Sequence, residues 1–339
     1  MESTIWREYL LNLPLPLAKL YSHAQIAKDV TARHHHSFYL FEALVKLLAT
    51  LLVMTYARER RQGATGDDRI NRQLLQLARP SLGQWAGILR ALARYFGQRP
   101  DAAIQPLGHL WRQLNQPHRD KPGLLALYQH TKRGPDGEPA GDQSCSILQV
   151  INALVPYRNT VIGHGAMRPE SFYAQFGALL FSAANEVLAE DTLHILGPRG
   201  TRLVYLTEVR TVAEDRVEVS LRELVGSAEG IQLDLLVLGR EAACERLSNR
   251  VAVLWPGQSV PLTLDPLLVF RKRTTADVLF LNSDRDGRHV VYLSYTSGEP
   301  EKDPEMVPDL AAQHCRRADH YARAARSAGG SEHRRKPLY

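Results

Sequence analysis

The feature that most constrains the fold is a change of hydrophobic period near Leu193. Before it, apolar residues recur at the spacing of buried helix faces. After it, short runs rich in β-branched and aromatic residues are separated by turn dipeptides, as in antiparallel strands. We therefore expect an α+β multidomain chain. It comprises an all-helical bundle over residues 1–191, a small all-β sandwich or barrel over 192–298, and a basic linker, helix and flexible tail over 299–339.

The most apolar stretch of the chain, residues 44–56, predicts a central core helix over about residues 36–62. A membrane span needs about 20 apolar residues, so this stretch is too short for one. The run of three histidines before it, His34, His35 and His36, is expected at a partly exposed helix start. Consecutive helical side chains point about 100° apart, so these three rings are not expected to converge on one metal ion.

Other helix boundaries in this part follow from local signals. Ser81 is a plausible N-cap for a helix through Phe96, and Ser144 or Ser146 opens a later one. Pro156 ends or kinks that later helix, because proline lacks the N–H that continues the hydrogen-bond ladder. A last helix is expected over about residues 169–188.

In the β-rich part we expect six to eight strands, with pairs at 202–211 and 216–221, 251–255 and 259–264, and 277–282 and 289–296. The turn of the third pair holds Asp284 and Asp286. These two carboxylates fit a hairpin tip better than a cation-binding loop. A polar linker and a helix over 308–327 are expected to follow.

Charge and cysteine usage bear on partners and location. The net charge of +6 and pI near 9.2 favour an anionic partner such as RNA, yet are equally compatible with none. The three cysteines lie far apart, which suits a reducing cytosol. The first twenty residues lack a basic region followed by an apolar core, so no signal peptide is expected. We predict a cytoplasmic protein without a membrane partner.

The candidate chemistry lies at Arg158, Asn159 and His164. A guanidinium fits phosphate oxygens, and an imidazole exchanges protons near neutral pH, so the two suit phosphodiester cleavage without a metal. The pattern of arginine, polar residue, four residues and histidine resembles the signature of HEPN-domain ribonucleases. Within residues 1–191, the resemblance implies a HEPN-like bundle in which Arg158 holds the phosphate, His164 serves as base or acid, and Asn159 orients the backbone or the substrate.

A second candidate pair lies inside the apolar helix, at Glu42 and Lys46. Their spacing allows an intrahelical salt bridge, and a helix with few solvated faces places such a pair beside a cleft. Several HEPN families carry a Glu-x-x-x-Lys pair on an early helix that lines the catalytic cleft, and Glu42–Lys46 resembles it. The alternative is a plain structural ion pair.

Helix geometry speaks against a site completed within one chain. Six positions along an ideal helix rotate by about 240° and rise by about 9 Å, so Arg158 and His164 do not share one face. HEPN enzymes commonly place two such motifs across a dimer interface. We therefore expect a homodimer in which both copies face a shared cleft, consistent with the frequency of twofold symmetry.

The resemblance implies a metal-independent endoribonuclease, a toxin or antiviral defence effector that leaves 2′,3′-cyclic phosphate and 5′-hydroxyl ends. No cofactor or metal is expected, and the partners would be RNA and a neighbouring regulatory or antitoxin protein. The alternative from another class is a non-catalytic module in which the helices dimerise and the β part recognises a protein or small ligand. A metal-dependent nuclease is the weakest option, because no carboxylate cluster is visible in the sequence.

Overall fold

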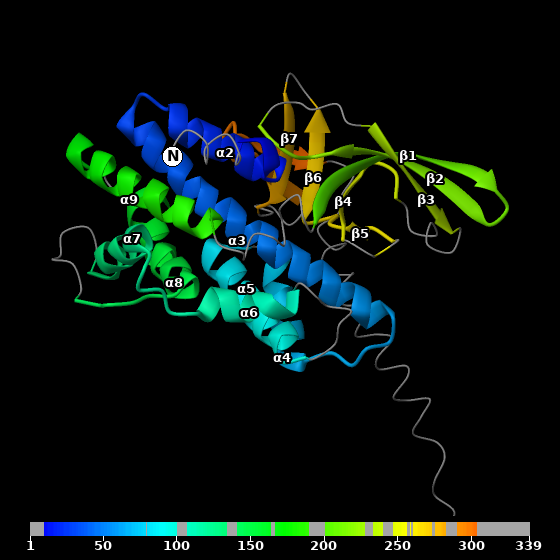
Figure 1. The fold of residues 1–339 in the computed structure, drawn as a ribbon, viewed down its shortest axis with the longest axis horizontal. Helices are drawn as coiled ribbons and strands as arrows, with labels where there is room; N and C mark the ends of the chain where they lie inside the picture. Colours follow the sequence, from blue (N-terminus) through cyan, green and yellow to red (C-terminus); the bar gives the residue numbers. More distant parts are fainter. Residues whose placement is uncertain are drawn as a thin grey trace, which may run out of the picture.

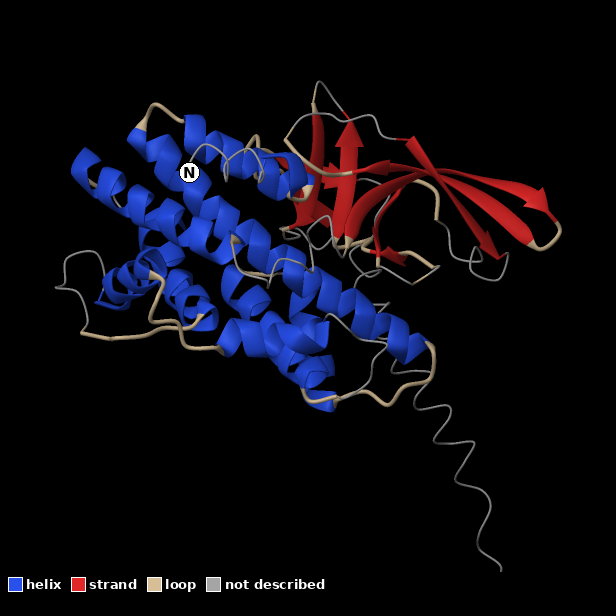
Figure 2. Ribbon diagram, viewed as in Figure 1, coloured by secondary structure: helices blue, strands red, loops and turns tan. Residues whose placement is uncertain are grey.

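The computed structural model describes residues 10–78, 80–99, 107–133, 141–163, 167–189, 201–227, 233–239, 247–255, 258, 260–272, 275–282 and 290–303. Its N-terminal part is helical, and two antiparallel sheets follow in the C-terminal half (Figures 1 and 2). The expectation of a helical part followed by a β-rich part is thereby confirmed. The linker helix expected over 308–327, the tail and the turn at Asp284 and Asp286 lie outside the described residues.

The described helices are ordered along the chain as follows: α2 (Leu15–Ile26), α3 (Val30–Arg61), α4 (Asp68–Leu74), the 3-10 turn η1 (Leu75–Ala78), α5 (Leu82–Gly97), α6 (Leu107–Asn115), α7 (Pro122–Arg133), α8 (Ile147–Tyr157), the π-helical turn η3 (Arg158–Gly163) and α9 (Glu170–Leu188). The long α3 packs against α2, α5 and α9 and runs through the helical part (Figure 1). Its side chains are buried around most of the circumference, as expected for a central helix.

The start of α3 differs from the prediction. Asp29 caps the helix by accepting a hydrogen bond from the Ala32 amide at 2.6 Å, so the helix is already formed at the three histidines. His34 is fully buried rather than partly exposed at a helix end. The prediction was wrong because His34 packs against Tyr157 and Tyr173, which are distant in the sequence.

Among the described helices, α3 is the one long and apolar enough to cross a membrane by length and composition. However, 94% of its most apolar window is buried inside the structure. A core helix passes the same test, and the packing around α3 is that of a core helix.

Two serines set helix starts as predicted. Ser81 and Ser146 each accept a hydrogen bond from the amide three residues on, and the glutamines at those positions bond back to the serine amides. These capping boxes satisfy amides that have no partner within the helix. Of the two candidates for the later helix, the cap is Ser146.

The strands form a five-stranded sheet in the order β3-β2-β1-β4-β5 and a four-stranded sheet in the order β6-β7-β8-β9. All pairings are antiparallel. The strands are β1 (Arg202–Ala213), β2 (Arg216–Glu223), β3 (Leu233–Gly239), β4 (Arg250–Leu254), β5 (Leu262–Thr263), β6 (Leu268–Lys272), β7 (Ala276–Leu281), β8 (Val290–Leu293) and β9 (Pro300–Asp303).

The three predicted strand pairs correspond to β1–β2, β4–β5 and β7–β8, which are neighbours in the two sheets. Residues 192–298 hold eight described strands, β1 to β8, which agrees with the six to eight expected. Residues 300–303, expected in a polar linker, form β9 beside β8. An edge strand is held by main-chain hydrogen bonds and can carry charged side chains, so its sequence lacks the apolar alternation of a buried strand.

The helical part and the sheets share one hydrophobic core, which joins α2 and α3 to Trp255, Phe280 and Tyr295. Two hydrogen bonds reinforce the junction: the Leu15 amide donates to the Leu224 carbonyl at 2.8 Å, and the Lys19 side-chain ammonium donates to the Ala276 carbonyl. The β1–β2–β3 ribbon extends away from the helices and has a smaller core of its own (Figure 2). The domain boundary at residues 191/192 stays a prediction.

Candidate functional site

Glu42 and Lys46 lie one turn apart on α3, and both are buried. The Lys46 Nζ lies 3.7 Å from the Glu42 Oε1, and their side chains are 1% and 6% exposed. The small cavity beside Glu42 has a volume of about 10 Å³, room for one water molecule at most. The expectation that this pair borders an open cleft is therefore wrong for this arrangement of the chain.

The Lys46 ammonium is held in an environment that disfavours its charge. Burial lowers its pKa to about 8, the Glu42 carboxylate opposes this effect, and the positive charge of Arg158 adds to it. The Tyr295 ring covers the ammonium, with the Nζ 5.0 Å from the ring centroid. A lysine with this pKa changes its charge near neutral pH, which is a property found at catalytic sites more often than elsewhere.

Tyr295, in the turn after β8, is the residue of this cluster that the sequence did not point to. Its ring packs against Tyr39 of α3 at 5.6 Å between centroids and against Phe280 of β7 at 5.4 Å. Burial and then the Glu42 charge raise the pKa of its hydroxyl well above the usual value. A contact between residues so far apart in the chain leaves no local signal that a single sequence could reveal.

Arg158 comes to this cluster from a different element, the π-helical turn η3. Pro156 lies just before it, inside α8, and cannot donate the hydrogen bond that continues an α-helix. The chain widens into η3, and the Thr160 hydroxyl donates to the Pro156 carbonyl at 3.1 Å. Such π-helical turns occur mostly as single turns, frequently at functional sites.

The Arg158 side chain is half-buried, and its buried Nε has no hydrogen-bond partner among the described residues. Burial raises the pKa of both Tyr39 and Tyr295 and lowers that of Lys46, and the Arg158 charge acts on each of the three to lower its pKa, so the guanidinium lies within electrostatic reach of them. A Cβ built at Gly163 would lie 3.6 Å from the Arg158 Nη1. The guanidinium therefore lies beside the residue that precedes His164.

The structure thus brings together three of the five predicted site residues. Glu42, Lys46 and Arg158, with Tyr295, form what we call the buried cluster. Asn159 is exposed to solvent, and His164 lies outside the described residues.

The three histidines of α3 do not form a common site. The His34 Nε2 lies 2.6 Å from the Tyr157 hydroxyl, and burial lowers the His34 pKa to about 3, with His35 acting in the same direction. His36 instead packs against His23 of α2 at 5.2 Å between ring centroids. Within the described ranges, no group of three or more His, Cys, Asp or Glu side chains is placed to hold a metal ion.

The buried cluster offers a permanent cation, a lysine with a pKa of about 8 and a carboxylate. These groups can bind an anion such as a phosphodiester and exchange a proton with it. Comparison with protein-family models, with curated proteins and with solved structures finds no match for this chain.

Proposed function

We propose that this protein is a metal-independent endoribonuclease whose helical part is a HEPN-like domain. The observation that supports the proposal best is the convergence of Arg158, from η3, with Glu42 and Lys46 of α3. The two patterns lie far apart in the sequence and on different elements, α3 and η3.

The reaction uses the RNA 2′-hydroxyl as nucleophile. A base takes its proton, the 2′-oxygen forms a bond to phosphorus, and the bond from phosphorus to the 5′-oxygen breaks as an acid protonates the leaving oxygen. In the proposal Arg158 neutralises the phosphate, and His164 acts as base or acid. Lys46 stabilises the developing negative charge. The products are a 2′,3′-cyclic phosphate and a 5′-hydroxyl end.

Access to the pair requires movement of the sheets. Glu42 and Lys46 are 5% and 1% exposed, and Tyr295 of the β-rich part covers the ammonium. RNA can therefore reach these two side chains only after Tyr295 moves away. In this proposal the β-rich part restrains the nuclease until a trigger or partner displaces it.

The wider setting follows from the family resemblance. We propose a homodimer in which Arg158 and His164 of both copies face one cleft. A cytoplasmic toxin or defence effector, held in check by a neighbouring regulatory or antitoxin protein, fits this activity.

The test is incubation of the protein with total RNA in EDTA, with end-group analysis of the fragments. We expect the wild-type chain to cleave slowly, as Tyr295 moves away only transiently, and Tyr295→Ala, which loosens the cover, to cleave faster. Both should leave 2′,3′-cyclic phosphate and 5′-hydroxyl ends, and His164→Ala should leave the RNA intact. Gln175→Ala, a change at an exposed position of α9, should retain cleavage. Equal cleavage by His164→Ala in EDTA would exclude both His164 and a metal as its source.

The burial of Glu42 and Lys46 also favours a second candidate, a non-catalytic dimerisation or binding module. In that case the pair joins the helices to the sheets as a structural ion pair. A folded wild-type chain that leaves RNA intact, both alone and with Tyr295→Ala loosening the cover, would support this alternative.

A further inference from the structure

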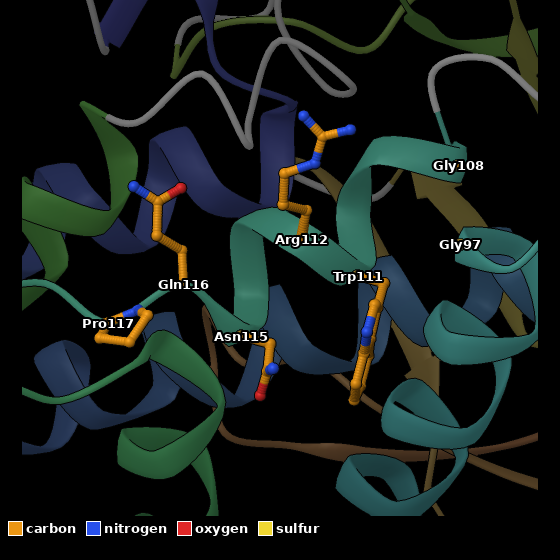
Figure 3. Close-up of a pocket in the computed structure, with 7 residues that line it drawn as sticks. All are labelled: Gly97, Gly108, Trp111, Arg112, Asn115, Gln116 and Pro117. Atoms are coloured by element: carbon orange, nitrogen blue, oxygen red, sulfur yellow. The ribbon is translucent and has the colours of Figure 1, made fainter.

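A second concave feature lies far from the motif in sequence, over the outer face of α6. Leu107, Leu110 and Leu114 bury the inner face of this helix. Gly108, Trp111, Arg112 and Asn115 follow the spacing of the opposite face. A hollow of about 490 Å³ lies over them (Figure 3), and we call it the α6 hollow. Its size falls within the range of about 300–1,000 Å³ typical of small-ligand pockets. Its lining residues are Gly97, Gly108, Trp111, Arg112, Asn115, Gln116 and Pro117.

The position of Trp111 depends on the glycine opposite. A Cβ built at Gly97 would lie 2.6 Å from the Trp111 Cβ, so a larger residue at position 97 would displace the tryptophan. Trp111 is partly exposed, whereas Trp85 and Trp255 are buried at 1% and 6% exposure. An indole held at the wall of a hollow presents a flat π-surface to a planar ligand.

The surroundings of the α6 hollow are basic. Residues 82–120 contain five arginines and two acidic residues, Asp101 and Asp120, and neither α5 nor α6 carries a carboxylate. One of the five, Arg99, is paired with Glu59 of α3. Arg90 and Arg94 are exposed on α5, and their spacing places them on the same helix face as Gly97. Arg112 is exposed at the α6 hollow itself. The ligand that fits is therefore an anion with a flat aromatic part.

We propose that the α6 hollow binds an unpaired base of single-stranded RNA. Trp111 stacks on the base, and the amide of Asn115, whose side chain points to the same side as Trp111 in Figure 3, bonds to its polar edge. Arg112 and the row of Arg90 and Arg94 hold the adjoining phosphates. This site uses none of the residues of the buried cluster, and binding at it requires no cleavage.

The test is fluorescence anisotropy of a labelled, fully 2′-O-methylated oligoribonucleotide titrated with the full chain. Methylation blocks the 2′-oxygen as nucleophile, so binding is measured whether or not the chain is a nuclease. We expect Trp111→Ala to weaken binding by about 5- to 150-fold and Trp111→Phe to retain most of it. Arg90→Gln should reduce the slope of log K against log salt concentration by about 0.7.

Arg216→Gln removes the same charge at an exposed position of β2 and serves as the matched control. Two results together would overturn the proposal, provided that both variants are folded by circular dichroism. Trp111→Phe would bind the oligoribonucleotide no better than Trp111→Ala, and Arg112→Gln would bind it no worse than Arg216→Gln. Binding without cleavage of unmodified RNA would sustain this site and remove the nuclease. Cleavage of unmodified RNA without Trp111-dependent binding would sustain the nuclease and remove this binding site.

Discussion

Replacing Glu42 with alanine is expected to lower the free energy of unfolding by about 3–5 kcal/mol, because it leaves a buried ammonium without its opposite charge. Lys46 is 1% exposed, and Glu42 is its partner at 3.7 Å. The loss is measured from urea unfolding at neutral pH. Glu42 raises the pKa of Lys46 in the wild type, so the folded Glu42→Ala chain loses the Lys46 proton at a lower pH than the wild type does. The difference in stability should therefore shrink as pH rises toward about 8, where Lys46 of the folded wild type also loses its proton.

The double variant Glu42→Leu with Lys46→Met is the control. It removes both charges and keeps apolar volume, so its stability should lie within about 1–2 kcal/mol of the wild type. A loss below about 1 kcal/mol for Glu42→Ala alone would show that the pair is solvated, as surface ion pairs are. The buried cluster would then be open to water without any movement of the sheets.

Acidification is expected to destabilise the protein through His34. Burial holds the pKa of this ring at about 3 in the folded chain, against 6.5 when it is unfolded. The unfolded chain therefore takes up a proton that the folded chain refuses. Stability from the neutral ring is complete above pH 6.5 and is lost as pH falls toward 3. Between neutral pH and about pH 4, the loss is on the order of 3 kcal/mol.

Carboxylates also titrate in this range, so the informative quantity is the difference between variants. His34→Gln should lose less stability than the wild type between neutral pH and about pH 4, as measured by urea unfolding at both pH values. His109→Gln, a change at an exposed position of α6, should behave like the wild type. An identical acid loss in His34→Gln and wild type would mean that His34 is protonated freely in the folded chain.

Features set by a few neighbouring residues could be predicted from the sequence. Ser81 and Ser146 cap helices because the glutamine three residues on completes the same capping box in each. The β1–β2 hairpin follows from two alternating runs around Glu214 and Asp215. In these cases the interacting groups lie within one turn or one hairpin, where a single sequence carries the information.

Features set by tertiary contact could not be predicted. Nothing near His34 in the sequence shows that Tyr157 and Tyr173 will enclose it, and an exposed helix start was the reasonable expectation. Tyr295 reaches Lys46 only because the sheets pack on α3. The burial of Glu42 and Lys46 depends on the same packing.

The candidate site contains residues that the sequence pointed to and contacts that only the tertiary structure reveals. The sequence identified Arg158, Glu42 and Lys46, and the structure gathers them. The calculation that residues 158 and 164 lie on different faces assumed an ideal α-helix. Pro156 instead leads into η3, a π-helical turn with more residues per turn than an α-helix, so the ideal rotation does not apply from Arg158 to Gly163. The Arg158 guanidinium lies beside Gly163.

In the proposed reaction, Arg158 neutralises the scissile phosphate without a metal. The most direct test of this role is the rate at which Arg158→Gln cleaves total RNA in EDTA, with Arg69→Gln as an exposed control that keeps its rate. We expect Arg158→Gln to be about 100- to 1,000-fold slower than the wild type at equal folded fraction. Cleavage by Arg158→Gln at the wild-type rate would contradict the account.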